Sequence, residues 1–150
     1  MKSSFRWRGG GWQLPANHLA QAMEKSVTLR LQLLRHLYVF QVQMSFTALA
    51  NGRYRLQERL ARWLLMAHDR VDGDQVALTH EFLALMLGAR RPGVTAALNA
   101  FEAERFIRVH RGGLTILDRS KLEEAANGCY GTPEAEYVRV FGEAQLQTIV

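Results

Sequence analysis

The chain has 150 residues, of which 48% are hydrophobic and 22% charged, so it suits one ordinary folded domain or a small domain with an appendage, and it is not a disordered polymer. Its single cysteine, Cys129, excludes an intramolecular disulfide and disfavours a cysteine-ligated metal or iron–sulfur site. The net charge of +5 is uneven, because residues 1–52 carry +5, residues 53–128 carry +2 and residues 129–150 carry −2. Bulk charge alone therefore does not decide between nucleic acid and other partners.

Two features bear on the compartment. No apolar run reaches the roughly 18 residues that a membrane-spanning helix needs. The basic N-terminal stretch MKSSFRWRGGGW is not followed by the apolar core of a secretory signal. Together with the lone cysteine, these features predict a cytoplasmic protein without a membrane partner.

The N-terminal third of the chain predicts two helices. Pro15 can open a short helix over about residues 16–24, because proline is tolerated in a first helical turn. Ser26 is a suitable N-cap for a longer helix that runs to about residue 50 and is closed by Asn51-Gly52.

The longer helix carries a broad apolar stripe, which needs a partner. A groove on the same chain could cover the stripe, but a second copy of the helix is the simpler partner. We therefore predict dimerisation through a set of mainly apolar side chains on this helix: Val27, Leu31, Leu33, Leu34, Leu37, Tyr38 and Gln41.

The middle of the chain predicts three helices. The first covers about residues 56–70 and is followed by a turn at 71–75 and a short strand at 76–78. Thr79 is a natural N-cap for the second, which Gly88 ends. Its expected buried face is formed by Phe82, Leu83, Met86 and Leu87.

The third of these helices runs from about Arg91 to Arg105, and a hairpin over residues 106–117 follows around a glycine-containing turn. Asp118 can cap a last helix that ends near residue 126. The sequence after Cys129 shows no strong pattern.

Two short helices joined by a glycine-containing turn and followed by a hairpin form a winged helix-turn-helix. Ala84 is small where the two helices must approach each other, Gly88 lies four residues later at the turn, and Val94 lies six residues further on. The predicted fold is mostly α: a long dimerisation helix followed by a winged helix-turn-helix domain with a small β-hairpin wing.

Arg90 and Arg91 stand where positive charge opposes the helix dipole, which an anionic partner would offset. Arginine can contact phosphate or read guanine, and backbone N–H groups at a helix N-terminus can bind phosphate. The predicted DNA-contacting residues lie at the helix starts, on the outer face of the second helix of the motif and at the wing tip: Thr79, Arg90, Arg91, Gly93, Thr95, Ala96, Asn99, His110 and Arg111.

Each of these residues also has a plainer interpretation. The two arginines can be solvated turn charges, and Thr79 can be a helix cap, with or without a phosphate contact. Asn99 can reach adenine or simply face water, and the polar pair His110-Arg111 is ordinary for an exposed hairpin tip. The whole arrangement could also be a structural helical hairpin.

The stretches TALANGRYRLQERLARWLLMAHDRV and LTHEFLALMLGARRPGVTAALNAFEAERFIRVHRGGLTILDR resemble the C-terminal half of Crp/Fnr-family transcription regulators. The resemblance covers about residues 26–130 and rests on the order and spacing of a long dimer helix, a linker helix, a helix-turn-helix, a wing and a short last helix. It implies a homodimer that binds a palindromic site in double-stranded DNA, with one recognition helix in each major-groove half-site. It also makes RNA polymerase a candidate partner.

The resemblance also implies individual roles. Arg91 falls on the family's base-reading arginine, Arg90 on the helix-capping position, and Gly93 on a position often taken by a phosphate-binding hydroxyl residue. Pro92 and Ala96 stand where the family often has an acidic residue and a further arginine. We therefore do not expect the DNA sequence that the best-known members prefer.

The family's N-terminal β-roll, which binds a cyclic nucleotide or another effector, has no counterpart in the sequence. Only about residues 12–25 resemble its trailing helix, and the cysteine set of iron–sulfur members is absent. We therefore expect a regulator without its sensor and without a cofactor. The expected divisions are a tail with a sensor remnant (1–25), a dimerisation helix (26–52), a winged helix-turn-helix domain (53–128) and a C-terminal tail (129–150).

An enzyme is disfavoured, and no catalytic residue or metal ligand is predicted. The five histidines show no metal-ligand spacing with carboxylates or Cys129. Asp69, Asp72 and Asp74 lack the other ligands of a calcium site and are interpreted as turn formers. The alternative function is a protein-interaction module that forms mixed dimers with a full-length relative without productive DNA binding of its own.

Overall fold

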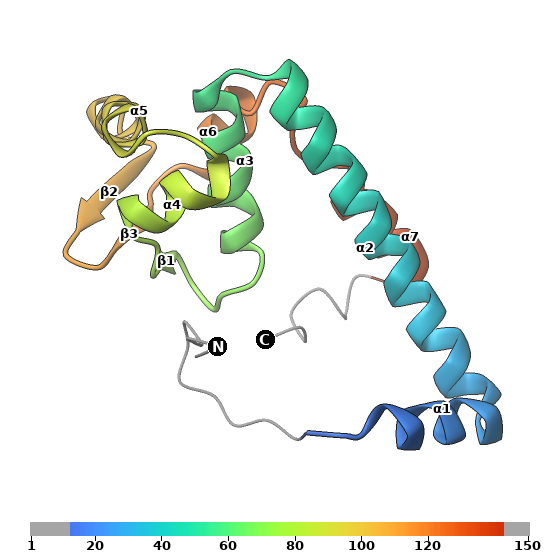
Figure 1. Cartoon of the computed structure of the whole chain (residues 1–150). Coiled ribbons are helices and arrows are strands. Elements are labelled where there is room, and N and C mark those ends of the chain that lie inside the picture. Colours follow the sequence, from blue (N-terminus) through green and yellow to red (C-terminus); the bar gives the residue numbers. More distant parts are fainter. Residues whose placement is uncertain (1–12, 143–150) are drawn as a thin grey trace. The chain divides into compact units, whose positions relative to one another are not determined.

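The computed structural model describes residues 13–142, so the predicted tail at residues 1–12 lies outside the described part. The chain divides between Leu37 and Tyr38 into two compact units. The first unit holds α1 (Ala16–Lys25), which starts directly after Pro15, and the beginning of α2 (Val27–Arg53). The second unit holds the rest of α2 and all later elements (Figure 1).

The expected cap of α2 is confirmed, because the Leu29 N–H donates to Ser26 Oγ at 3.2 Å. The expected end of this helix at Asn51-Gly52 is wrong, since α2 continues to Arg53 and the Tyr54 N–H still donates to the Ala50 carbonyl. Glycine inside a helix costs up to about 1 kcal/mol relative to alanine. Burial of Ala50 in the core offsets that cost and keeps the last turn helical.

The second unit is built on α3 (Leu56–His68), which follows the predicted range with an end two residues earlier. After it come β1 (Gln75–Val76), α4 (His80–Leu87), α5 (Arg91–Ala103), β2 (Ile107–His110), β3 (Gly113–Ile116), α6 (Arg119–Ala125) and α7 (Thr132–Phe141). Figure 1 shows α3 beside α4 and α6, and the sheet contacts α5 through β2 and α3 through β1. The predicted class, a mostly helical fold with a winged helix-turn-helix, is confirmed.

The wing is a three-stranded antiparallel sheet in the order β1-β3-β2. β3 pairs with β2 through Ile107 and Ile116, and with β1 through Val76 and Leu114. The predicted hairpin is therefore correct, and the short strand before α4 is its third member. β1 is shorter than the predicted segment, because the Leu78 N–H turns back to the Val76 carbonyl.

One core joins these elements. Its fully buried side chains include Leu60 and Leu64 of α3, Leu83 of α4 and Leu98 of α5. The prediction that Met86 belongs to the buried face of α4 is wrong, because its side chain is 37% exposed. Ala84 is buried in its place, since the close approach of α4 and α5 favours the smaller residue.

α7 corrects the expectation of a C-terminal segment without a pattern. The helix begins after Gly131, whose N–H donates to the Glu134 carboxylate at 2.9 Å, and Pro133 lies in its first turn. Figure 1 shows α7 alongside α2, where the Tyr38 hydroxyl donates to Glu136 Oε1 at 2.5 Å. The pKa of Glu136 is lowered to about 2 because the Arg139 guanidinium and the Tyr38 hydroxyl donate to its carboxylate.

Candidate nucleic-acid interface

The turn between α4 and α5 has the geometry that the sequence predicts. The Phe82 N–H donates to Thr79 Oγ1 at 3.3 Å, so Thr79 is the N-cap of α4. Gly88 adopts a left-handed backbone with φ of 58°, which a side chain would disfavour. These two residues set where α4 starts and where the chain turns into α5.

The start of α5 differs from the expectation that backbone amides face an anion. Arg90 is the N-cap without a side-chain capping bond, Pro92 has no N–H, and the Gly93 N–H donates to the Arg90 carbonyl at 3.0 Å. Few main-chain donors are therefore free at this end. Positive charge at the start of α5 comes instead from the exposed guanidinium groups of Arg90 and Arg91.

Most of the predicted contact residues of α5 lie where a ligand could reach them. Arg90, Arg91, Gly93, Ala96 and Asn99 are exposed, while Val94, Ala97 and Leu98 are buried in the core. This division follows the helical period of the segment. It leaves an exposed face of α5 that carries the polar side chains of Arg91 and Asn99.

Thr95 is the exception among these residues. It is half-buried, and its Oγ1 lies 3.0 Å from His80 Nδ1 of α4. The hydroxyl therefore joins the two helices of the motif. Sequence reasoning did not select His80, and the only available signal was its position directly after the Thr79 cap.

Gly93 offers a direct test of the α5 start. A Cβ added at Gly93 would meet only the flexible end of Leu56, with Cδ2 3.3 Å away. We expect Gly93→Ser to stabilise the protein by about 0.5 kcal/mol, because glycine is a poor helix former. Chemical denaturation of the parent and the variant measures this difference, and a less stable variant would show that the start of α5 needs glycine.

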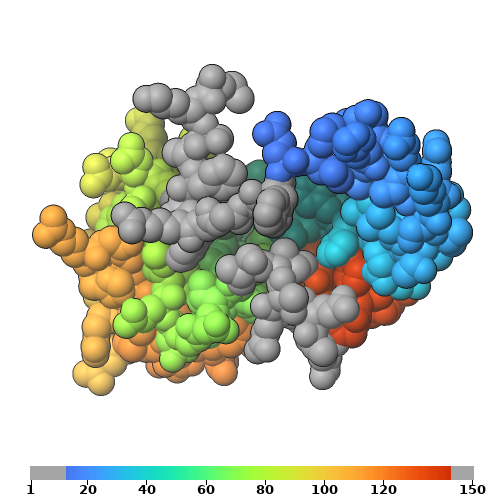
Figure 2. All heavy atoms as spheres, turned by 90° about the horizontal axis from the view of Figure 1, so that it is seen from below, coloured from blue at the N-terminus to red at the C-terminus, as the bar shows by residue number. Residues whose placement is uncertain are grey.

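The wing brings two more predicted residues to the surface. The β2–β3 turn places His110 and Arg111 in exposed positions, and Gly112 takes a positive φ of 88°. The wing is held against α5 by the Glu102 carboxylate, which accepts the Val109 N–H at 2.8 Å. In Figure 2 the orange wing lies next to the green segment that carries β1, with which β3 pairs.

A groove of about 380 Å³ lies between the start of α4, the start of α5 and the wing. Its polar and charged lining consists of Thr79, His80, Glu81, Arg91 and His110. Three of these residues, Thr79, Arg91 and His110, were predicted as contacts from the sequence. The fold thus brings together positions that are up to 31 residues apart in the chain.

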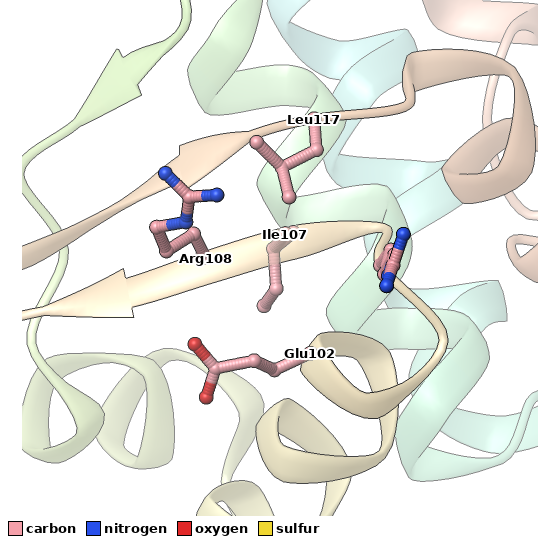
Figure 3. A pocket seen from close by; sticks show the side chains of 5 residues that line it. Glu102, Ile107, Arg108 and Leu117 are labelled. Carbon is pink, nitrogen blue, oxygen red and sulfur yellow. The ribbon is translucent and has the colours of Figure 1, made fainter.

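A second hollow, of about 410 Å³, lies at the other end of α5 and is lined by Glu102, Arg105, Ile107, Arg108 and Leu117 (Figure 3). In Figure 3 the Ile107 side chain points toward Glu102. The hollow lies where α5 meets β2. The Glu102 carboxylate in its lining already accepts the Val109 N–H, so we interpret the hollow as part of this structural junction.

Two buried or bridging arginines were not found by sequence reasoning. Arg59 Nη1 donates to Asn51 Oδ1 at 2.9 Å and to the Leu87 carbonyl at 3.1 Å, which links the end of α2 to the end of α4. Arg62 is 1% exposed, and its Nη1 donates to Thr47 Oγ1 at 3.2 Å. Both arginines tie α3 to the part of α2 in the second unit.

The predicted dimerisation residues are mainly exposed. Leu33 is half-buried, and the remaining members are exposed: Val27, Leu31, Leu34, Leu37, Tyr38 and Gln41. Leu34 is 50% exposed and Leu37 63% exposed. Exposed leucines at this density mark a surface that is suited to a partner.

Residues 13–142 lack two features that would indicate other kinds of site. No helix among these residues is long and apolar enough to cross a membrane. Within the same residues, no group of three or more His, Cys, Asp or Glu side chains is placed to hold a metal ion.

The fold and this interface define a winged helix-turn-helix protein. Residues 58–125 match the family model of the Crp-like helix-turn-helix domain. The resemblance is therefore confirmed for this segment, which forms a Crp-like helix-turn-helix domain.

Solved structures agree with this fold. A CRP-family transcriptional regulator from Thermus thermophilus, TTHB099, is 24% identical, with a TM-score of 0.57 over 63% of this chain and 52% of its own. A mutant of CooA from Carboxydothermus hydrogenoformans is 24% identical, with a TM-score of 0.64 over 73% of this chain and 54% of its own. The chain thus spans about half the length of these structures. A search of curated proteins found no match.

Proposed function

We propose that the protein is a sequence-specific, DNA-binding transcription regulator that acts as a homodimer on a palindromic site. The observation that carries this proposal is the pair of exposed arginines at the start of α5, next to the groove and the wing. A polyanion would offset the unfavourable interaction of these charges with the helix dipole. A cytoplasmic location and contacts with RNA polymerase belong to the same proposal.

Dimerisation is supported by the apolar side chains that α2 exposes. Two parallel copies of such a helix would bury Leu31, Leu34 and Leu37 against each other. The two α5 helices would then be presented to half-sites one helical turn of DNA apart, or a multiple of it. This symmetry is the reason to expect a palindromic operator.

The same exposed side chains support a second candidate function. A module that pairs with a full-length relative would use α2 in the same way and would need no DNA contact of its own. The two candidates differ in what the purified chain does alone. Only the regulator is expected to form a homodimer that retards DNA.

The test combines mass in solution with selection of bound sequences from random double-stranded DNA. The regulator predicts a dimeric mass and an enriched palindrome, and binding that weakens steeply with salt because phosphate contacts release counterions. A monomer that enriches no sequence and binds only a full-length relative would replace the regulator with the interaction module.

Arg91→Ala is expected to weaken binding to the selected site by about 1–3 kcal/mol and to relax the preference at one base pair. Arg53→Ala removes the same charge from the last residue of α2 and is the matched control. Binding isotherms against the selected site and its single-base variants measure both effects. If Arg91→Ala keeps the parent's affinity for every sequence, Arg91 is not a reading residue.

A further inference from the structure

The groove beside α5 contains two histidines from elements that are far apart in sequence. His80 is the first residue of α4, and His110 is the last residue of β2. His80 is half-buried and His110 is exposed. Histidine is the side chain whose charge ordinarily changes between about pH 5 and pH 8.

The contact with Thr95 occupies one of the two ring nitrogens of His80, which leaves the other to bind an anion. With Nδ1 held 3.0 Å from the Thr95 hydroxyl, only Nε2 is left for a ligand in the groove. A neutral ring can make this contact in either tautomer: with Nδ1–H it presents a bare Nε2 to the groove, and with Nε2–H it accepts the Thr95 hydroxyl proton at Nδ1 and offers phosphate one hydrogen bond without a charge. A protonated ring donates from both nitrogens, so it keeps the Thr95 contact and adds a positive charge to the hydrogen bond that it donates to phosphate.

The formal charge of the lining changes with these two rings. Arg91 of α5 contributes +1 and Glu81 of α4 contributes −1, so the lining is neutral when both histidines are neutral. It becomes +2 when both are protonated. A phosphate in this groove is therefore favoured chiefly when the histidines carry charge, and the nearby Arg90 and Arg111 act at any pH.

We propose that His80 and His110 form a proton-dependent phosphate site, so that DNA binding by this protein strengthens as the pH falls through the histidine range. The proposal rests on the proposed function as a DNA-binding regulator. His80 also acts as a positioning residue, because its Nδ1 contact holds Thr95 of α5.

The sign of the effect follows from linkage. Phosphate stabilises the charged histidines, so DNA binding is coupled to proton uptake. The affinity gain is present at low pH and is lost as the pH rises.

The experiment measures affinity for the DNA selected above, and for a labelled duplex of mixed sequence, at about pH 6 and about pH 8. The parent is expected to bind about tenfold more weakly at the higher pH. Its dependence of log affinity on log salt is expected to be steeper by about 2 at the lower pH, because two more cations meet phosphates.

Four variants separate charge from structure. His80→Gln with His110→Gln should bind at about pH 6 as weakly as the parent does at about pH 8. His80→Arg with His110→Arg should bind tightly at both. Thr95→Val removes the contact with His80 but keeps both histidines, so its pH dependence should remain, as should that of the control His18→Gln on α1. Thermal unfolding confirms that each variant is folded.

The outcomes are distinct. Affinity that is independent of pH in the parent, or pH dependence that survives in the double glutamine variant, overturns the histidine site and leaves the regulator intact. A parent and double arginine variant that bind neither duplex at any pH overturn the regulator, and the histidine site with it.

Discussion

Leu34→Lys is expected to convert the protein from a dimer to a monomer. Leu34 lies on α2 with half of its side chain exposed, among the leucines proposed to meet a second copy. Lysine forms helices about as well as leucine, so α2 itself should persist. In the dimer, however, two lysines related by symmetry would place like charges in an apolar contact, which is strongly unfavourable.

Loss of the dimer should also weaken binding to a two-half-site operator by about 100-fold or more, because linked binding sites gain an effective concentration that a monomer lacks. Sedimentation measures the mass, and a titration with one half-site and with the full palindrome measures the avidity. Leu117→Lys, a similarly exposed leucine outside α2, is the control for mass. A Leu34→Lys protein that remains a dimer would locate the subunit contact elsewhere.

The helix-turn-helix was predictable because its signals are local. Thr79 caps its own helix three residues later, Gly88 supplies the positive φ that the turn needs, and Asp118 accepts the Lys121 N–H at the start of α6. The two capping hydrogen bonds each join residues three positions apart, and the backbone conformation of Gly88 concerns a single residue. The identity of the cap or turn residue is therefore enough to place the boundary.

The contents of the groove were only partly predictable. Arg91 and His110 were selected for their exposed positions at a helix start and at a wing tip. The contact of His80 with Thr95 spans 15 residues and depends on how α4 crosses α5, which no local pattern encodes. A histidine directly after a helix cap does not by itself indicate a functional site. His80 became a candidate only because the structure shows its contact with Thr95.

The burial of the charged side chain of Arg62 was also not predicted from the sequence. An arginine in the α3 pattern is expected to face water, yet Arg62 is buried, because α2 passes beside it and offers Thr47 as an acceptor. The end of α2 shows the same effect, since packing of Ala50 outweighs the helix-ending tendency of Asn51-Gly52. In both cases a contact between distant segments decides against the local preference.

Gly113→Ala is expected to destabilise the second unit by about 2–3 kcal/mol, which corresponds to a fall of roughly 10 °C or more in Tm. A Cβ at this first residue of β3 would lie 2.6 Å from the Val76 carbonyl oxygen, 3.2 Å from Ala77 Cα and 3.1 Å from His110 Cε1. Two of these neighbours are backbone atoms, so the strand pair itself must move. The same movement would displace His110 from the groove.

Gly52→Ala is the matched comparison, because nothing lies within 4 Å of a Cβ at this helical glycine. It should stabilise the protein by up to about 1 kcal/mol. We therefore expect chemical denaturation to show changes of opposite sign in the free energy of unfolding of the two variants, although both replace glycine with alanine. If Gly113→Ala is as stable as the parent, β1 and β3 do not approach as closely as the structure shows, and the position of His110 in the groove loses its support.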